Sequence, residues 1–282
     1  MKFTVWIVTW TGDHDAWRCL FEVAAGIRIS LEKLGHTADL FAASEIPPEA
    51  GRLIVFNAHR LPPDLVLPDD AIIFNAEQVQ LDGPTGEGWK VSSYLRRLKE
   101  HLVWDYCDEN INRLHLLGVD RVVKCRVGYY PELTDIIPAE QQDVDVLFVG
   151  SLNERRVSIL HSIASRKMTV RVLAGVYGKE RNDWIARSKV VLNVHFYEKP
   201  IFEIFRVSHL LANKKCVVTE GGGRDFELEQ LADDTCVREP YGDSLVKACL
   251  RMVHDADARR RQGDFGFRIF SGIDQTKELP EL

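Results

Sequence analysis

The sequence predicts an α/β protein with two domains, each built on a parallel sheet, and three observations lead to this prediction. Apolar runs of strand length alternate with amphipathic stretches of helix length, which is typical of parallel sheets with crossover helices. The alternation stops in a polar connector around Pro138 and starts again at Val144. The length of 282 residues suits two domains of ordinary size.

The first half opens with a strand, because Phe3–Thr9 is almost entirely apolar. The long periodic stretch Ala16–Leu34 predicts a helix, and Gly35 follows it as a residue favoured just past a helix end. The remaining elements expected here are strands at Ala38–Phe41, Arg52–Asn57, Ala71–Asn75 and Arg121–Val127 and helices at Ser92–His101 and Glu109–Leu117.

The second half repeats the alternation after the connector. Val144–Val149 predicts a strand, and Gly150-Ser-Leu-Asn leads from it into a helix at Glu154–Ser165. The further elements expected are strands at Val170–Ala174, Val190–Val194 and Cys216–Thr219 and helices at Lys179–Arg187, Glu203–Ala212 and Ser244–Arg261. We therefore expect domains at 1–135 and 136–282, with the last helix as a candidate to cross back to the first domain.

Composition narrows the function classes. The net charge of −6 argues against a nucleic-acid partner, because polyanion binding needs a clustered basic surface. The six cysteines include no CxxC pair, so we expect reduced, mostly buried thiols and no metal site. The apolar run in residues 1–10 is too short to span a membrane and lacks a cleavage site. We expect a cytoplasmic protein without a transmembrane segment, and loose membrane association stays open.

The strand–turn–helix around Gly150 is the first candidate site. A glycine at the end of a strand lets backbone approach a ligand, and the next helix points free N–H groups toward the same place. Arg155 and Arg156 open that helix, and a guanidinium suits a diphosphate. The dinucleotide fingerprint GxGxxG and the Walker loop are both absent from the sequence. The alternative is an ordinary turn followed by two solvated arginines.

The second candidate site surrounds a strand that ends at His195. A Pro-containing loop follows this strand, and the next helix begins near Glu203 with Arg206 one turn later. A carboxylate suits the hydroxyls of a ribose, whereas an arginine and helix N–H groups suit phosphate oxygens. The alternative is an ion pair between Glu203 and Arg206 within the helix.

Several segments of the second half resemble the donor domain of GT-B fold glycosyltransferases, closest to the group-one-like and spore-maturation-type bacterial members. The segments are Val146-Leu-Phe-Val-Gly-Ser-Leu-Asn-Glu-Arg-Arg, Gly175-Val-Tyr-Gly, Val190-Val-Leu-Asn-Val-His and Phe202-Glu-Ile-Phe-Arg-Val-Ser-His-Leu-Leu-Ala-Asn-Lys-Lys-Cys-Val-Val-Thr-Glu. The resemblance covers roughly residues 144–240. It implies two Rossmann-like domains that face each other across a cleft, with a nucleoside diphosphate sugar in the second domain.

The resemblance also assigns roles to residues. Glu203 matches the glutamate that commonly binds the ribose, and His209 lies where the family has a second acid. The loop at Gly175 matches the segment that recognises the base, so Tyr177 is a candidate to stack on it, with a plain surface tyrosine as the alternative. The glycine-rich loop Gly221-Gly-Gly could close over the donor phosphates or be only a mobile turn.

The first domain should bind the acceptor. An inverting transferase needs a general base there, and the candidates follow predicted strands: Asp13 and His14 after the first, Glu77 after the one at Ala71–Asn75. Asn57 and His59 are weaker candidates, and these side chains could equally cap helices or orient loops. A retaining enzyme would need no such base. We expect Trp104 and Tyr106, near Asn110, to serve the core instead.

These observations predict a glycosyltransferase that moves a sugar from a nucleoside diphosphate sugar to an acceptor hydroxyl. The acceptor is a glycan, a lipid-linked molecule or a small molecule, and neither a metal nor a resident cofactor is expected. Two alternatives stay open. A sugar-nucleotide epimerase would convert the donor without an acceptor, and a non-catalytic binding or scaffolding module would keep the fold without the chemistry.

Overall fold

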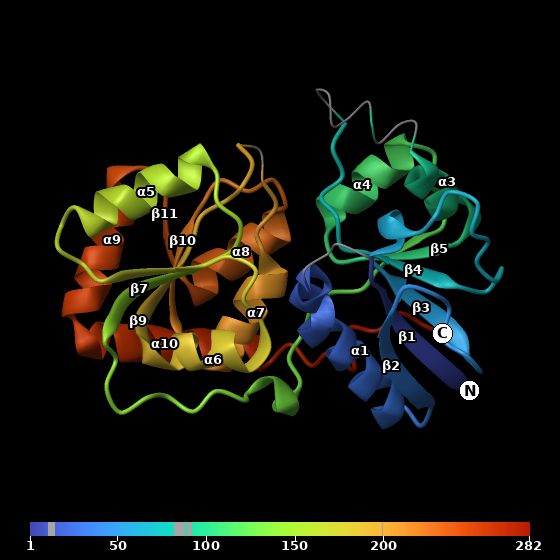
Figure 1. Cartoon of the computed structure of the whole chain (residues 1–282), viewed down its shortest axis with the longest axis horizontal. Helices are drawn as coiled ribbons and strands as arrows, with labels where there is room; N and C mark the ends of the chain where they lie inside the picture. Colours follow the sequence, from blue (N-terminus) through green and yellow to red (C-terminus); the bar gives the residue numbers. More distant parts are fainter. Residues whose placement is uncertain (11–14, 82–87, 89–91, 199) are drawn as a thin grey trace. The chain divides into compact units, whose positions relative to one another are not determined.

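The structure, a computed structural model, describes residues 1–10, 15–81, 88, 92–198 and 200–282. The chain divides into two compact units (Figure 1). Unit 1 comprises Met1–Tyr130 together with Asp274–Leu282, and unit 2 comprises Pro131–Ile273. Each unit is a parallel sheet covered by helices, so each is described by itself below.

Unit 1 contains a six-stranded parallel sheet in the order β2-β1-β3-β4-β5-β6. Its strands are β1 (Lys2–Val8), β2 (Thr37–Ala43), β3 (Arg52–Phe56), β4 (Ile72–Asn75), β5 (Leu102–Asp105) and β6 (Val122–Lys124). Its helices are η1 (Ala16–Leu20), α1 (Phe21–Lys33), η2 (Ala58–Arg60), α3 (Ser93–Glu100) and α4 (Asp108–Leu116). The helices α3 and α4 lie on one face of the sheet and α1 on the other (Figure 1).

The core of unit 1 explains why these segments become strands. Trp6, Val55 and Ile73 project from neighbouring strands onto Leu98 of α3 and Leu114 of α4, and all five side chains are fully buried. Burying one large apolar side chain contributes about 1.5–3 kcal/mol. Both faces of the sheet are covered, so its strands read as near-continuous apolar runs rather than as an alternation.

Unit 2 contains a five-stranded parallel sheet in the order β11-β10-β9-β7-β8. Its strands are β7 (Val144–Val149), β8 (Val170–Leu173), β9 (Ser188–Asn193), β10 (Cys216–Glu220) and β11 (Val237–Glu239). Its helices are η3 (Pro131–Leu133), α5 (Glu154–Ala164), α6 (Gly178–Arg187), α7 (Ile204–Ala212), α8 (Phe226–Thr235), α9 (Asp243–His254) and α10 (Ala256–Phe270). The helices α5 and α9 pack on one face, where they cover Phe148 and Leu192.

The predicted helix at Ser244–Arg261 is wrong, because two helices occupy this stretch and run on to Phe270. The break falls at Asp255, whose carboxylate accepts a hydrogen bond of 2.8 Å from the backbone N–H of Ala258. A carboxylate in this position caps a new helix, which separates α10 from α9. The strands β5 and β11, which have four and three residues, were not predicted either, and neither was the ten-residue helix α8.

The segment after α10 belongs to unit 1, while α10 itself contacts α7, α8 and β10 of unit 2. Gln275 fixes this return, because its Oε1 accepts a hydrogen bond of 2.7 Å from Gly128 N and its Nε2 donates one of 3.0 Å to the Arg126 carbonyl. Unit 1 is therefore assembled from two separate stretches of the sequence, and unit 2 from one.

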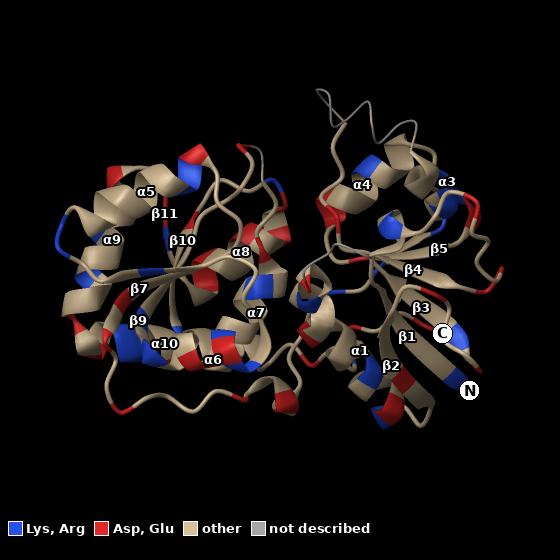
Figure 2. Ribbon diagram, in the orientation of Figure 1, with Lys and Arg blue, Asp and Glu red and all other residues tan. Residues whose placement is uncertain are grey.

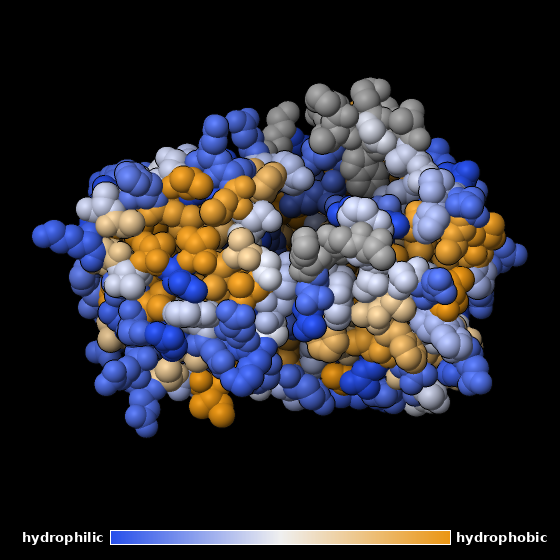
Figure 3. Space-filling model, in the orientation of Figure 1, coloured by the Kyte–Doolittle hydropathy of each residue, from blue (hydrophilic) through white to orange (hydrophobic). Residues whose placement is uncertain are grey.

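The surfaces of the units carry mixed charge, and apolar areas are visible on both units in Figure 3. Lys and Arg alternate with Asp and Glu along the ribbons of both units (Figure 2). On unit 2, apolar residues gather between α5 and α6 in the view of Figure 3. The strand β8 lies at the edge of the unit 2 sheet, and its Val170 and Val172 are only partly buried. Within the described part of the chain, none of the helices is long and apolar enough to span a bilayer.

Candidate functional site

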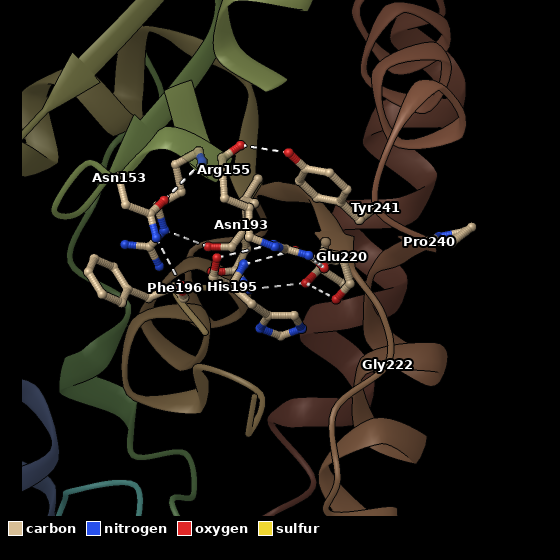
Figure 4. A network of polar contacts seen from close by, with 12 residues as sticks. Asn153, Arg155, Asn193, His195, Phe196, Glu220, Gly222, Pro240 and Tyr241 are labelled. Atoms are coloured by element: carbon tan, nitrogen blue, oxygen red, sulfur yellow. Dashed lines mark hydrogen bonds and ion pairs between the residues drawn. The ribbon is translucent and has the colours of Figure 1, made fainter. Parts of the chain in front are cut away.

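Polar side chains meet at the carboxyl ends of three neighbouring strands of unit 2. The sheet order places β10 beside β9 and β9 beside β7, so the residues that end or follow these strands are neighbours. They include Gly150 after β7, Asn193 and His195 at the end of β9, and Glu220 at the end of β10. Figure 4 shows Asn193, His195 and Glu220 in one network of polar contacts. This edge of a parallel sheet is where ligands bind in α/β proteins.

Glu203 is the centre of this network. It lies just before the first residue of α7, and its Oε2 accepts a hydrogen bond of 2.9 Å from Asn193 Nδ2. The same oxygen lies 2.8 Å from His195 Nδ1. Burial alone would raise the pKa of Glu203, but the charge and hydrogen bond of His195 and the charge of Arg206 lower it to about 2. Glu203 is therefore an anion at neutral pH.

His195 is completely buried and is held on two sides. Its backbone N–H donates to Glu220 Oε2 at 3.1 Å, and its Nδ1 faces Glu203. Its Nε2 is buried without a hydrogen-bond partner among the described residues. Burial alone would lower the pKa of His195, but the carboxylates of Glu203, Glu220 and Glu229 outweigh this effect and raise it.

Arg206 and Gly150 fit each other closely. Arg206 Nη1 donates a hydrogen bond of 2.9 Å to Asn193 Oδ1, which directs the guanidinium toward the end of β7. A Cβ atom at Gly150 would lie 3.0 Å from Arg206 Nη2, and the backbone φ of Gly150 is +144°. The positive φ favours glycine at this position, and an added methyl group would crowd the end of the Arg206 side chain.

The Arg155 guanidinium is already bound to protein groups, whereas the sequence analysis predicted that it would contact a diphosphate or be solvated. Its two terminal nitrogens donate to the Glu220 carboxylate, and Nη1 also donates to the His195 carbonyl at 3.2 Å. The Tyr241 ring centroid lies 3.9 Å from the Arg155 guanidinium carbon, and the Tyr241 hydroxyl donates to the Arg155 carbonyl at 2.9 Å (Figure 4). These contacts tie the start of α5 to β10 and to the loop after β11.

Arg156 is the more deeply buried of the two arginines. Its Nε donates a hydrogen bond of 2.9 Å to the Val194 carbonyl, and its Nη1 donates one of 2.8 Å to the Ser151 carbonyl. Its Nη2 lies 3.6 Å from Glu203 Oε1. Burial and the nearby Arg206 charge lower the pKa of Arg156 to about 10.

The charges of this network do not balance. Among the described residues, three guanidinium groups lie around two carboxylates, and these surroundings raise the pKa of one imidazole beside them. The guanidinium groups belong to Arg155, Arg156 and Arg206, the carboxylates to Glu203 and Glu220, and the imidazole to His195. A partly buried cluster with excess positive charge at the end of a sheet is suited to a ligand with negatively charged oxygens.

The glycine-rich loop after β10 is held against unit 2. The backbone N–H of Gly222 donates a hydrogen bond of 3.1 Å to Glu229 Oε2, and Glu229 forms a salt bridge with Arg238. A Cβ atom at Gly223 would overlap the Glu229 carboxylate, and one at Gly221 would overlap Arg238. Gly221 and Gly223 therefore let the backbone lie directly on the ion pair of Glu229 and Arg238.

Gly175 and Tyr177 lie beyond β7 from this network. Both follow β8, and β7 stands between β8 and β9 in the sheet. Gly175 has a φ of +68°, and open space surrounds the place of its missing Cβ. Tyr177 is half-buried and directly precedes α6. Base recognition by this loop stays a prediction.

Unit 1 contains the candidates for the general base, and the structure describes some of them but not all. Asp13 and His14 lie outside the residues that the structure describes. The Glu77 side chain follows β4 and is half exposed, and its Oε1 lies 3.6 Å from His59 Nδ1. The Asn57 side chain supports the fold, because its Nδ2 donates a hydrogen bond of 2.9 Å to the Val8 carbonyl.

A buried polar network beneath Glu77 fixes its backbone. Asp105 Oδ2 accepts a hydrogen bond of 2.6 Å from Asn75 Nδ2, and Asn110 Nδ2 donates 2.8 Å to the Glu77 carbonyl. The Tyr94 hydroxyl donates 2.9 Å to Asn75 Oδ1. Burial raises the pKa of Asp105 to about 7, although hydrogen bonds from Asn75, from the Cys107 backbone and from Asn110 oppose the shift.

Glu220 and Asp105 are two acids of these networks that the sequence analysis did not single out as site residues. Both are acids at the carboxyl end of a buried strand, and that position was the signal available in the sequence. The core role expected for Trp104 and Tyr106 is confirmed, because both are buried.

Comparisons with known proteins agree with the fold. No protein-family model matches the chain, and no curated protein matches it. AviGT4, a glycosyltransferase involved in avilamycin A biosynthesis, is similar in structure with a TM-score of 0.51 and 17% identity, over 98% of each chain. MurG of Acinetobacter baumannii has a TM-score of 0.46 and 9% identity, over 95% of this chain and 94% of MurG. Together with the two parallel sheets, the likeness to AviGT4 confirms the predicted fold class, two Rossmann-like domains of the GT-B type.

Proposed function

We propose that this protein is a glycosyltransferase that moves a sugar from a nucleoside diphosphate sugar to an acceptor hydroxyl. The observation that carries the proposal is the uncompensated positive charge around Glu203 at the carboxyl edge of the unit 2 sheet. The diphosphate is the most strongly charged part of such a donor, and arginines at strand ends suit it. The group-one-like and spore-maturation-type members remain the families that the sequence resembles most.

In this proposal the donor diphosphate lies against Arg206 and His195, next to the backbone of Gly150. Arg206 is placed by Asn193, and Gly150 leaves room for the guanidinium. Stabilising charge that develops on the leaving phosphate is the main catalytic task of such a site. Arg155 has a different task, because its pairing with Glu220 leaves it to hold the strand ends together.

The acceptor binds on unit 1, where Glu77, Asp13 and His14 are the proposed general bases. Glu77 is supported by its fixed backbone, its exposure and its neighbour His59. A carboxylate in reach of the acceptor hydroxyl takes its proton as the oxygen attacks the sugar. We propose that the acceptor is a glycan, a lipid-linked molecule or a small molecule, and that the protein acts in the cytoplasm without a metal or resident cofactor.

Nucleotide binding is the first test. Thermal unfolding is followed with UDP, GDP, ADP, CMP and dTDP sugars, and a ligand at a hundred times its dissociation constant should stabilise by about 2.7 kcal/mol. The shift should disappear in Arg206→Gln and persist in Arg187→Gln, whose side chain pairs with Asp143 on the surface. Absence of a shift with every nucleotide would contradict the proposal and favour a binding or scaffolding module.

Turnover then separates the remaining classes. Transfer to an acceptor should continue in the presence of EDTA, because no divalent metal takes part in the proposed reaction. Conversion of the sugar nucleotide without any acceptor would instead identify a sugar-nucleotide epimerase.

A further inference from the structure

We infer that His195 donates a hydrogen bond from Nε2 to the departing phosphate oxygen, and that Glu203 is a positioning residue which holds this imidazole rather than a ligand of the ribose. This inference rests on the proposed function and assigns its leaving-group contact. It differs from what the sequence resemblance implies for Glu203. Four features of the described residues support it.

The first feature is that the two imidazole nitrogens of His195 differ in their hydrogen bonding. Nδ1 lies 2.8 Å from Glu203 Oε2, so an Nδ1–H donates to this carboxylate and fixes the ring. Nε2 has no hydrogen-bond partner among the described residues, although the side chain is fully buried. A buried polar atom without a partner costs about 1–3 kcal/mol, so its persistence points to a partner that arrives with the ligand.

The second feature is the negative charge around His195, where one carboxylate contacts the ring and another contacts the backbone. Glu203 faces His195 from the start of α7 through its side chain, and Glu220 faces it from the end of β10 through the His195 backbone. Glu229 on α8 contributes a third negative charge. Arg155 on α5 donates to the His195 carbonyl, and its own charge is paired with Glu220. These surroundings raise the pKa of His195, which favours the imidazolium with an N–H at both nitrogens.

The third feature is the occupation of Glu203. Its Oε2 already faces both Asn193 and His195, and its Oε1 faces Arg156 at 3.6 Å. Only 15% of its side chain is exposed. A carboxylate surrounded in this way serves to fix cations, and little of its surface is left for a ribose hydroxyl.

The fourth feature is a chain of hydrogen bonds that connects the two cationic donors, His195 and Arg206. Asn193 links them, since its Nδ2 donates to Glu203 and its Oδ1 accepts from Arg206 Nη1. Glu203 therefore orients His195, Asn193 orients Arg206, and a hydrogen bond joins Asn193 to Glu203. A ligand anion that contacts Arg206 beside Gly150 lies next to the same carboxyl edge of the sheet as His195.

The chemical step balances without a further reactant. The bond between the anomeric carbon and the phosphate oxygen breaks, and its electron pair stays on the phosphate. The acceptor oxygen forms the new bond to the anomeric carbon and loses its proton to the general base. The imidazolium of His195 keeps its proton and strengthens its hydrogen bond as negative charge grows on the phosphate oxygen.

An NMR titration tests the charge state of His195 independently of any nucleotide. With labelled histidine, the ring of His195 should titrate above its ordinary value, and Glu203→Gln should bring the titration down. The exposed Glu154 on α5 gives a matched control, because Glu154→Gln should leave the His195 titration unchanged. A titration of His195 that is the same in wild type and in Glu203→Gln would overturn the role of Glu203. Thermal unfolding of each variant verifies that it is folded.

Binding of inorganic pyrophosphate tests the contact itself. We expect His195→Gln to bind pyrophosphate about tenfold more weakly than wild type and Glu154→Gln to bind it equally well, and binding to wild type should weaken as the imidazolium deprotonates. Transfer should slow by about 10²-fold in kcat in His195→Gln, as when one oxyanion donor is removed. Equal pyrophosphate affinity in wild type and His195→Gln would overturn the inference alone. Absence of binding of both pyrophosphate and sugar nucleotides to wild type would overturn the proposed function with it.

Discussion

The Arg155 guanidinium is bound by the Glu220 carboxylate across the end of the unit 2 sheet, and the Tyr241 ring lies against its face. Only 5% of the Glu220 side chain is exposed. A buried carboxylate needs its cation, so this pair is part of the structure that positions the site. The pair also makes two hydrogen bonds to the His195 backbone, one from Arg155 Nη1 to the carbonyl and one from the N–H to Glu220 Oε2.

We expect Glu220→Gln to lower the free energy of unfolding by about 3 kcal/mol, because the variant leaves Arg155 partly buried without its carboxylate. The double variant Arg155→Gln, Glu220→Gln should lose less than the sum of the two single variants. Urea unfolding of the four proteins measures the coupling. The exposed Glu180→Gln on α6 is the control, and it should leave unfolding unchanged. Purely additive losses would show that the pair contributes nothing.

Gly150→Ala should weaken pyrophosphate binding at least tenfold. The added methyl group would lie 3.0 Å from Arg206 Nη2 and push the guanidinium away from the end of β7. Gly35→Ala separates this effect from backbone strain, because Gly35 also has a positive φ of +85° but no heavy atom within 4 Å of the added Cβ. Isothermal titration calorimetry gives both affinities. If the two alanine variants bind pyrophosphate equally well, Arg206 is not the residue that Gly150 accommodates.

Asp105 should make the stability of the protein fall as the pH rises. Burial raises its pKa to about 7 in the folded protein, whereas an unfolded aspartate has a pKa near 4. The folded state thus binds the proton more tightly, and its full contribution is present below pH 4 and lost as the pH passes 7. This change amounts to roughly 4 kcal/mol. In Asp105→Asn the loss between pH 4 and pH 8 should be smaller by about that amount.

The exposed Asp108 on α4 supplies the comparison for Asp105. Asp108 pairs with Lys124 at the surface, and Asp108→Asn should keep the pH profile of the wild type. Denaturant unfolding across the pH range measures all three proteins. The same profile in wild type and Asp105→Asn would show that Asp105 ionises without a penalty.

Glu77→Gln should slow sugar transfer by 10²–10⁴-fold in kcat while donor affinity stays unchanged, if Glu77 is the general base. Glu77 belongs to unit 1 and the donor network to unit 2, so the two measurements are independent. The exposed Glu45→Gln is the matched control. Unchanged transfer in Glu77→Gln would leave Asp13 and His14 as the proposed bases, or indicate a retaining reaction that needs none.

The sequence predicted the parts of the site that lie close together along the chain. His195, Glu203 and Arg206 belong to one strand–loop–helix connection, and Gly150 ends a strand with an unmistakable apolar pattern. Local periodicity and turn chemistry are sufficient to find such residues. The same reasoning identified most strands of both sheets, since most of them are rich in apolar residues.

The remainder depends on contacts between distant segments. Glu220 joins the site only because β10 lies next to β9, and strand order cannot be read from an apolar pattern. Asp105 stands in register with Asn75, and this pairing likewise requires the sheet to be known. The strand β5 escaped prediction because its four residues follow α3 almost directly, and so Asp105 was not recognised as a strand-end acid.

The return of Gln275 to unit 1 has a consequence for the order in which the protein can mature. Unit 2 is encoded without interruption, so a fragment of residues 131–273 contains every strand and helix that it needs. During translation, however, the strands of the first sheet are synthesised long before Gln275. The hydrogen bonds of Gly128 N and the Arg126 carbonyl to Gln275 can therefore form only later. Unit 1 therefore reaches its final form only after unit 2 has been synthesised.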